Sequence, residues 1–199
     1  MKLSRTSKMP CHSYGHPYCR TGSKLRCIPD TVCSNCYVHT YPTTYLFPST
    51  KRANLERFEA LSNPLWDIEL AVLIEEAGED YFRWHDIGDI VNLQHYRAIC
   101  RVASLTPHVK HWLPTKEWYL TQYLGEKPKN LTVRFSLFFL EQDRPPTLPD
   151  SVLTSGVASA NWICPASKQD GKCLRCRMCW EDSKHIVYHF NKKRGNYVS

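Results

Sequence analysis

The chain has 199 residues, ten of them cysteines, and a formal net charge of +7. This length is enough to bury an apolar core, and no apolar run approaches the roughly 20 residues that span a bilayer, so a miniature disulfide scaffold and a membrane protein are both excluded. The basic first ten residues lack the apolar region of a secretory signal. We therefore expect a cytoplasmic protein, in which closely spaced cysteines indicate metal binding.

The first half of the chain predicts a loop and two helices. Residues 1–47 are rich in Pro, Tyr, Ser, Thr and Cys without periodicity, which is typical of a loop organised by metal. A helix is expected from the N-cap candidate Ser49 through Leu61, and a second from Asn63-Pro64 to a stop at Gly78. The second helix has enough apolar residues to predict burial on most of its sides.

Strands and helices alternate in the second half. Strands are expected at residues 81–85, 109–113 and 131–139, with weaker candidates at 151–156, 162–163 and 185–190. A helix with one buried face, which includes Cys100 as a core residue, follows the first strand, and a short helix closed by Gly125 covers residues 116–124. This order predicts βαβ units and a parallel sheet.

The predicted fold class is α/β, a partial, open parallel β/α barrel, because a complete eight-stranded barrel typically takes about 250 residues. We expect one domain over residues 1–199, consisting of a Cys-rich N-terminal loop (1–47), a β/α core (48–163) and a Cys-rich C-terminal segment (164–199).

Ligands of parallel sheets bind at the carboxyl ends of the strands. The predicted strand ends carry His85-Asp86, Thr115-Lys116 and Cys164. Asp86 or Asp89 could bind a ligand amine and His85 could move a proton, although the same carboxylates could equally cap the next turn and helix. Arg83 and Arg134 lie within apolar strands, where each needs an anionic ligand, a metal cluster or an acidic partner.

The C-terminal cysteines give the stronger metal signal. Cys173, Cys176 and Cys179 have the Cys-x2-Cys-x2-Cys spacing of ferredoxin-type [4Fe–4S] ligation, and Cys164 can supply a fourth thiolate. Zinc usually takes two separate Cys-x2-Cys pairs, so this run favours iron–sulfur over zinc.

The N-terminal cysteines allow two ligand sets. Cys33 and Cys36 form a Cys-x2-Cys pair that Cys11 and Cys19 could complete to four thiols, which would close a cluster. Alternatively, Cys27 joins Cys33 and Cys36, and three thiols leave one iron open to a substrate or cofactor. The first set predicts electron transfer or structural support, and the second predicts an enzyme.

Several segments resemble the bacteriophage gene product 88 family, in matching order over nearly the whole chain. They are Met9-Pro10-Cys11, residues 21–25, Val32-Cys33-Ser34-Asn35-Cys36-Tyr37, residues 82–89, 112–117 and 131–134, and Gly171-Lys172-Cys173. This resemblance implies a viral protein that acts in the cytoplasm of an infected host cell.

A looser resemblance is to radical S-adenosylmethionine (AdoMet) enzymes. Cys33-x2-Cys36-Tyr37 is similar to the end of their Cys-x3-Cys-x2-Cys motif, although Cys27 lies two residues too far away to complete it. Gly88-Asp89 is similar in position to the segment that holds the AdoMet amino group. The resemblance implies a partial barrel with a Cys-rich loop after the first strand, and AdoMet as a cofactor bound near His85, Asp86, Gly88 and Asp89.

The sequence thus predicts an iron–sulfur protein with two [4Fe–4S] clusters, a redox or radical enzyme with a small-molecule substrate or a host redox partner. The predicted metal ligands are Cys11, Cys19, Cys33, Cys36, Cys164, Cys173, Cys176 and Cys179. Two alternatives stay open: a non-catalytic electron carrier or host-interaction protein, and a zinc-organised module whose Trp, Tyr and basic residues bind nucleic acid. Nucleic-acid binding is the less favoured of these, and no membrane partner is expected.

Overall fold

The computed structural model describes residues 1–36, 38, 47–191 and 196–198. Its strands form one eight-stranded sheet in sequence order, in which β2 to β7 are parallel neighbours and β1 and β8 are antiparallel to the strands beside them. The strands are β1 (Ser4–Arg5), β2 (His12–Tyr14), β3 (Tyr81–Trp84), β4 (Lys110–Thr115), β5 (Leu131–Leu140), β6 (Leu153–Ala158), β7 (His185–Asn191) and β8 (Asn196–Val198). The predicted α/β class and the open, mostly parallel sheet are confirmed.

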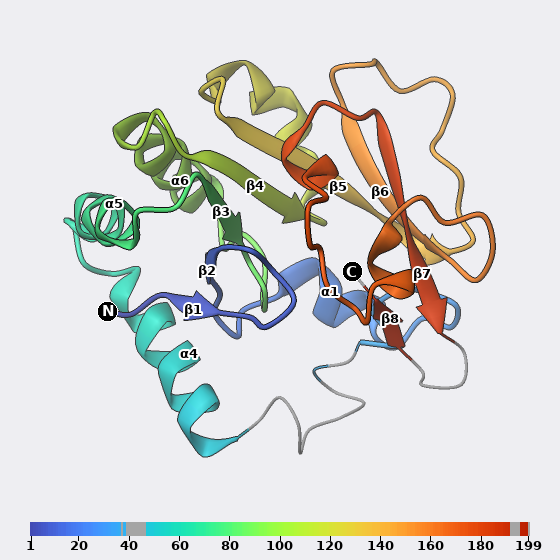
Figure 1. Cartoon of the computed structure of the whole chain (residues 1–199), viewed down its shortest axis with the longest axis horizontal. Coiled ribbons are helices and arrows are strands. Elements are labelled where there is room, and N and C mark those ends of the chain that lie inside the picture. The colour runs from blue at the N-terminus through green and yellow to red at the C-terminus, as the bar shows by residue number, and fades with distance from the viewer. Residues whose placement is uncertain (37, 39–46, 192–195, 199) are drawn as a thin grey trace.

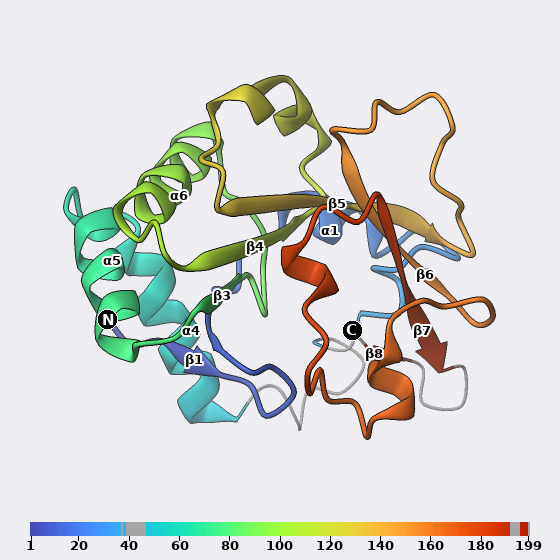
Figure 2. The same cartoon turned by 45° about the horizontal axis from the view of Figure 1, so that its top comes forward.

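The sheet curves into an arc with helices on its outer side. The α-helices are α1 (Arg20–Leu25), α4 (Pro48–Ala60), α5 (Trp66–Ala77) and α6 (Leu93–Leu105), and the 3-10 helices are η1 (Trp118–Glu126), η2 (Pro165–Lys168) and η3 (Met178–Trp180). Figures 1 and 2 show α4, α5 and α6 outside the arc, whereas α1 and the C-terminal segment that precedes β7 lie within it. Among the described residues, no helix has the length and apolar character needed to cross a membrane.

Local sequence explains where the helices begin and end. Pro48 occupies the first turn of α4, where its missing N–H costs nothing, and Gly78 ends α5 in the left-handed conformation at φ +63°. Asn92 caps α6, because its side chain accepts a hydrogen bond from the His95 N–H at 2.9 Å. These helices confirm the predicted ones within a few residues.

The core divides into two parts. The larger one packs α5 and α6 against β3, β4 and β5, and it includes Cys100 as expected. The smaller one lies within the arc and joins Cys11, Cys164, Cys173 and Cys179 to side chains of β7.

Three predictions about elements are wrong. The described part of residues 1–47 is more than a loop, because β2 and α1 form there and β2 is the first of the six parallel strands. The helix α5 is buried on one face only, since Ile68 and Val72 are 52% and 50% exposed. Residues 162–163 form no strand, although the Ile163 N–H donates to the Val187 carbonyl at 3.0 Å.

Candidate functional site

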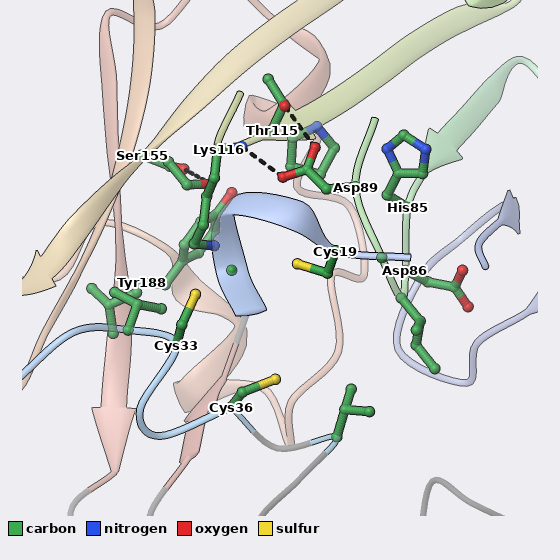
Figure 3. Close-up of a pocket in the computed structure, with 18 of the residues that line it drawn as sticks. Cys19, Cys33, Cys36, His85, Asp86, Asp89, Thr115, Lys116, Ser155 and Tyr188 are labelled. Carbon is green, nitrogen blue, oxygen red and sulfur yellow. Dashed lines mark hydrogen bonds between the residues drawn. The ribbon is translucent and has the colours of Figure 1, made fainter. Parts of the chain in front are cut away.

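A cavity of about 150 Å³ lies at the carboxyl ends of the parallel strands. Figure 3 shows side chains from the segments after β2, β3 and β4 converging on it, together with Ser155 of β6 and Tyr188 of β7. This is the edge at which the sequence predicted ligand binding, because all the parallel strands end there.

Three cysteines line this cavity: Cys19, Cys33 and Cys36. Cys19 immediately precedes α1, and the other two follow the bridge between Thr31 and Phe139, the latter in β5. In Figure 3 their side chains lie around a common space. Thr31 fixes this turn, because its hydroxyl donates to the Leu25 carbonyl at 2.8 Å and accepts from the Ser34 N–H at 3.0 Å.

Gly22 makes room for two of these sulfurs. A Cβ at this position would collide with Cys19 Sγ and lie 3.4 Å from Cys33 Sγ. The first turn of α1 therefore requires a glycine so that Cys19 and Cys33 can face the same side of the helix.

Lys116 gives the cavity a positive charge beside the thiols. Burial disfavours the charged form of its ammonium, but the neighbouring Cys33, Asp89 and Cys19 outweigh this cost and raise the pKa of Lys116. Burial raises the pKa of Cys19 to about 12 and also raises that of Cys33, so these thiols need a cation or a metal to hold them as thiolates.

Asp89 holds Lys116 in place. Its buried carboxylate accepts hydrogen bonds from Thr115 Oγ1 at 2.6 Å, from the Lys116 N–H at 2.8 Å and from the Ile90 N–H at 2.8 Å. Burial raises the pKa of Asp89 to about 6, and these hydrogen bonds oppose the rise. Asp89 thus orders the turn after β4, while the helix cap expected of it comes from Asn92.

The remaining residues predicted to bind a cofactor, His85, Asp86 and Gly88, also line the cavity. The segment that carries them runs along the one after β2, with the His85 N–H donating to the Tyr14 carbonyl at 2.7 Å. At Gly88 φ is +87°, and a Cβ would collide with the His16 carbonyl oxygen. Close backbone packing therefore explains Gly88 without a ligand.

The C-terminal cysteines form a second site within the arc. Cys164, Cys173 and Cys179 are buried and Cys176 is half-buried. The Cys176 N–H donates to the Cys173 carbonyl at 2.8 Å, and Cys179 Sγ lies 3.4 Å from the Tyr188 hydroxyl. All four thiols predicted from the spacing are thus brought to one region of the core.

Arg134 of β5 secures this second site. Its guanidinium is fully buried and donates to the backbone carbonyls of Thr154, Ser183 and Glu181 at 3.1, 2.8 and 2.9 Å. Arg134 was expected to pair with an anionic ligand, a metal cluster or an acidic residue, but its observed partners are main-chain oxygens. These hydrogen bonds hold the segment after Cys179 in place.

The structure separates the other cysteines from the cavity. Cys11 is 1% exposed and packs with the C-terminal cysteines, close enough to Cys173 for their charges to interact. Cys27 is exposed and does not line the cavity. The cavity therefore has Cys19 as the third thiol, so it contains the first predicted set without Cys11 and lacks the Cys27 of the alternative set.

Arg83 lies between the two sites. Its guanidinium stacks on Trp112 at 4.8 Å from the ring centroid, and both side chains line the cavity. The same positive charge acts on Cys11 and Cys173. In the sequence, the only indication of a role for Arg83 was that a charged residue lies within an apolar strand.

The comparisons with known proteins identify one family. A family model described as gene product 88 matches residues 3–156, which include the three cavity cysteines and end before Cys164. No curated protein and no solved structure matches the chain.

Proposed function

The chain belongs to the gene product 88 family, and we propose that it is an iron–sulfur protein with two [4Fe–4S] clusters, one of which makes it a redox or radical enzyme. The observation that carries this proposal is the convergence of Cys19, Cys33 and Cys36 on one cavity. Three thiols beside an open space are what an enzyme cluster with an accessible iron requires.

The spacing of the sulfurs favours clusters over zinc. A tetrahedral zinc ion with Zn–S bonds of about 2.3 Å holds its sulfurs within about 4 Å of one another. Among the described residues, no three cysteine sulfurs all lie within 4.8 Å of one another. A cubane spreads its thiolates more widely, because each one binds a different iron.

The cavity residues fit such a cluster by charge as well. A cluster held by three thiolates supplies one-electron chemistry at an iron with a free ligand position. Lys116 places a cation beside the thiolates, and Asp89 fixes the backbone that carries it. The surrounding strand ends limit access of water to the sulfurs, since Cys33 is buried and Cys19 and Cys36 are half-buried.

We infer AdoMet as the co-substrate from the topology. Six parallel strands follow one another in sequence order, and Cys19 comes after β2, the first of them, as in the radical AdoMet enzymes that the sequence resembles. The spacing differs from theirs, because α1 occupies the interval between Cys19 and Cys33. Since Asp89 already accepts three hydrogen bonds, we assign it the positioning of Lys116 and not the binding of the AdoMet amine.

The second cluster would be closed. Cys164, Cys173, Cys176 and Cys179 offer four thiolates, and Lys8 and Arg134 add buried positive charge around them. With every iron ligated by protein, this site is suited to relaying electrons or to holding the C-terminal segment.

The test is to purify the protein without oxygen, record its visible spectrum, and measure iron, sulfide and zinc per chain. We expect a brown protein with about eight iron atoms and, after reduction, cleavage of added AdoMet. The Cys19→Ser variant should lose about half of the iron and the cleavage, whereas the Cys27→Ser variant should keep both, because Cys27 is exposed and outside the cavity.

Two other outcomes would overturn parts of the proposal. A colourless protein with about two zinc ions would end the iron–sulfur assignment and favour a binding module, to be tested by salt-dependent binding of nucleic acid. An iron–sulfur protein that neither binds nor cleaves AdoMet would leave an electron carrier without the radical chemistry.

A further inference from the structure

Three buried histidines meet behind the cavity. His16 follows β2, His85 follows β3, and His95 lies in α6, so the three come from segments far apart in the sequence. They are 0%, 4% and 7% exposed. One ring nitrogen from each lies within 4.8 Å of those of the other two, and the ring centroids are 5.2 to 5.5 Å apart.

The ring nitrogens of this triad are short of hydrogen-bond partners. Five of the six are buried without a partner among the described residues, and the sixth, His95 Nδ1, accepts a long hydrogen bond from the Val91 N–H at 3.3 Å. The Phe58 ring packs against His16, and the Trp66 ring packs against His95. Buried polar atoms normally have partners, so this concentration of unpaired nitrogens indicates a ligand that they share.

The backbone at His85 supports this interpretation. His85 has φ +52°, a left-handed conformation that is costly for a residue with a side chain. The hydrogen bond from its N–H to Tyr14 holds it there. Such strain is typical of positions at which a side chain must be aimed at a functional site.

We propose that His16, His85 and His95 together bind one divalent transition-metal ion, with one nitrogen from each ring as a ligand. Three imidazoles without a carboxylate or a thiolate suit zinc, iron, copper or nickel and do not suit magnesium or calcium. Burial lowers the pKa of His16 to about 4 and that of His95 to about 3, which keeps these rings neutral and able to coordinate.

The site has an entry path and a structural consequence. His85 also lines the cavity, so an ion can reach the triad from there; Figure 3 shows its ring apart from the three cysteine side chains. The bound ion would tie the segments after β2 and β3 to α6. Coordination through His95 Nε2 moves the proton to Nδ1, so the Val91 contact must lengthen when the metal binds.

The test uses zinc as the probe and the cluster-loaded protein. After treatment with a mild chelator, the protein is titrated with Zn²⁺, and its zinc content and zinc X-ray absorption are measured. We expect one zinc per chain with nitrogen ligands at about 2.0–2.1 Å. Sulfur ligands at about 2.3 Å would place the zinc at the cysteines, and either that result or no bound zinc would overturn the proposal.

Matched variants separate coordination from folding. His95→Gln should lower zinc affinity by more than about 100-fold, since the loss of residues that merely orient a ligand already costs 10–100-fold. The control is His111→Gln, another fully buried histidine of the same core, which bonds Thr106 and lies outside the triad; it should keep the zinc. Retention of zinc by His95→Gln would sink the proposal, and the absorption result on the unaltered chain stands if a variant fails to fold.

The proposal is independent of the iron–sulfur assignment. Cys33→Ser should lose the cavity iron and keep the nitrogen-coordinated zinc, whereas His95→Gln should do the reverse. A protein without iron that still binds zinc through nitrogen would therefore overturn the proposed clusters and leave this site intact.

Discussion

The two cysteine sites differ in number of thiols, in access and in the cation beside them. The site of Cys19, Cys33 and Cys36 faces a cavity and has a lysine at its side. The C-terminal site offers four thiols with Cys11 close by and is secured by an arginine bonded to main-chain carbonyls. Under the proposed function, the first site would leave one iron open and the second would close around its cluster.

The largest expected effect comes from removing one thiol from each site. Cys36 and Cys176 form a matched pair for this test, because both are half-buried and each is the second cysteine of a Cys-x2-Cys pair. Each serine variant should lose about half of the iron, since a cluster that lacks one thiolate is held poorly. Only Cys36→Ser should also lose AdoMet binding, measured by isothermal titration.

Equal loss of AdoMet binding in both variants would break this comparison. It would mean that the closed site also contributes to the small-molecule site, or that its loss unfolds the sheet. Circular dichroism of the two variants distinguishes these outcomes.

Gly22→Ala tests the open site without removing a thiol. The added Cβ would collide with Cys19 Sγ. A free cysteine side chain can rotate away, so the fold should persist, but a sulfur bound to a cluster cannot move, so cavity iron should fall by at least half. Iron analysis and thermal unfolding measure the two effects, and Gly125→Ala, whose Cβ would meet nothing within 4 Å, is the control.

Arg134→Gln tests the closed site. The variant removes a buried charge that bonds Thr154, Ser183 and Glu181, so the free energy of unfolding should fall by about 3 kcal/mol. The control is Arg144→Gln, because Arg144 also donates to carbonyls, at Leu148 and Pro149, but on a partly exposed loop. Arg144→Gln should lower the free energy of unfolding, measured with urea, by less than about 1 kcal/mol. An equal decrease in both variants would show that Arg134 does not stabilise the closed site more than an exposed arginine stabilises a loop.

The sequence predicted the α/β class and most strands because, in these elements, the spacing of apolar residues along the chain matches the side that the structure buries. β3, β4 and β5 read as short apolar runs and α6 as a helix with one buried face, and all four formed as expected. β2 was missed because its three residues, His-Ser-Tyr, carry almost no pattern of their own. It becomes a strand by pairing with β3, where Arg83 and Trp84, the partners of Ser13 and Tyr14, each lie 70 residues further along the chain.

The candidate sites show the same limit. The Cys-x2-Cys spacings correctly brought Cys33 to Cys36 and Cys173 to Cys176, because neighbours in sequence share a turn. Spacing could not assign Cys11 and Cys19: Cys11, immediately before β2, packs in the smaller core, whereas Cys19, after β2, lines the cavity. Nor could it bring His16 and His95 to His85, because that contact depends on how α6 packs on the sheet.

The smallest predicted effect concerns the charge of Lys116. Its ammonium lies among Cys19, Cys33 and Cys36, so it stabilises the additional negative charge that a cluster gains on reduction. Lys116→Gln should therefore lower the reduction potential of the cavity cluster, by a shift on the order of 100 mV for one charge in a partly buried site. The C-terminal cluster in the same protein should keep its reduction potential. The control variant is Arg26→Gln: Arg26 also lines the cavity but is exposed, so solvent screens its charge and its loss should shift neither potential by much. Redox titration followed by electron paramagnetic resonance resolves the two clusters. Equal shifts in both would show that Lys116 acts on the protein as a whole, and the distinction between a lysine-tuned open site and an arginine-secured closed one would no longer hold.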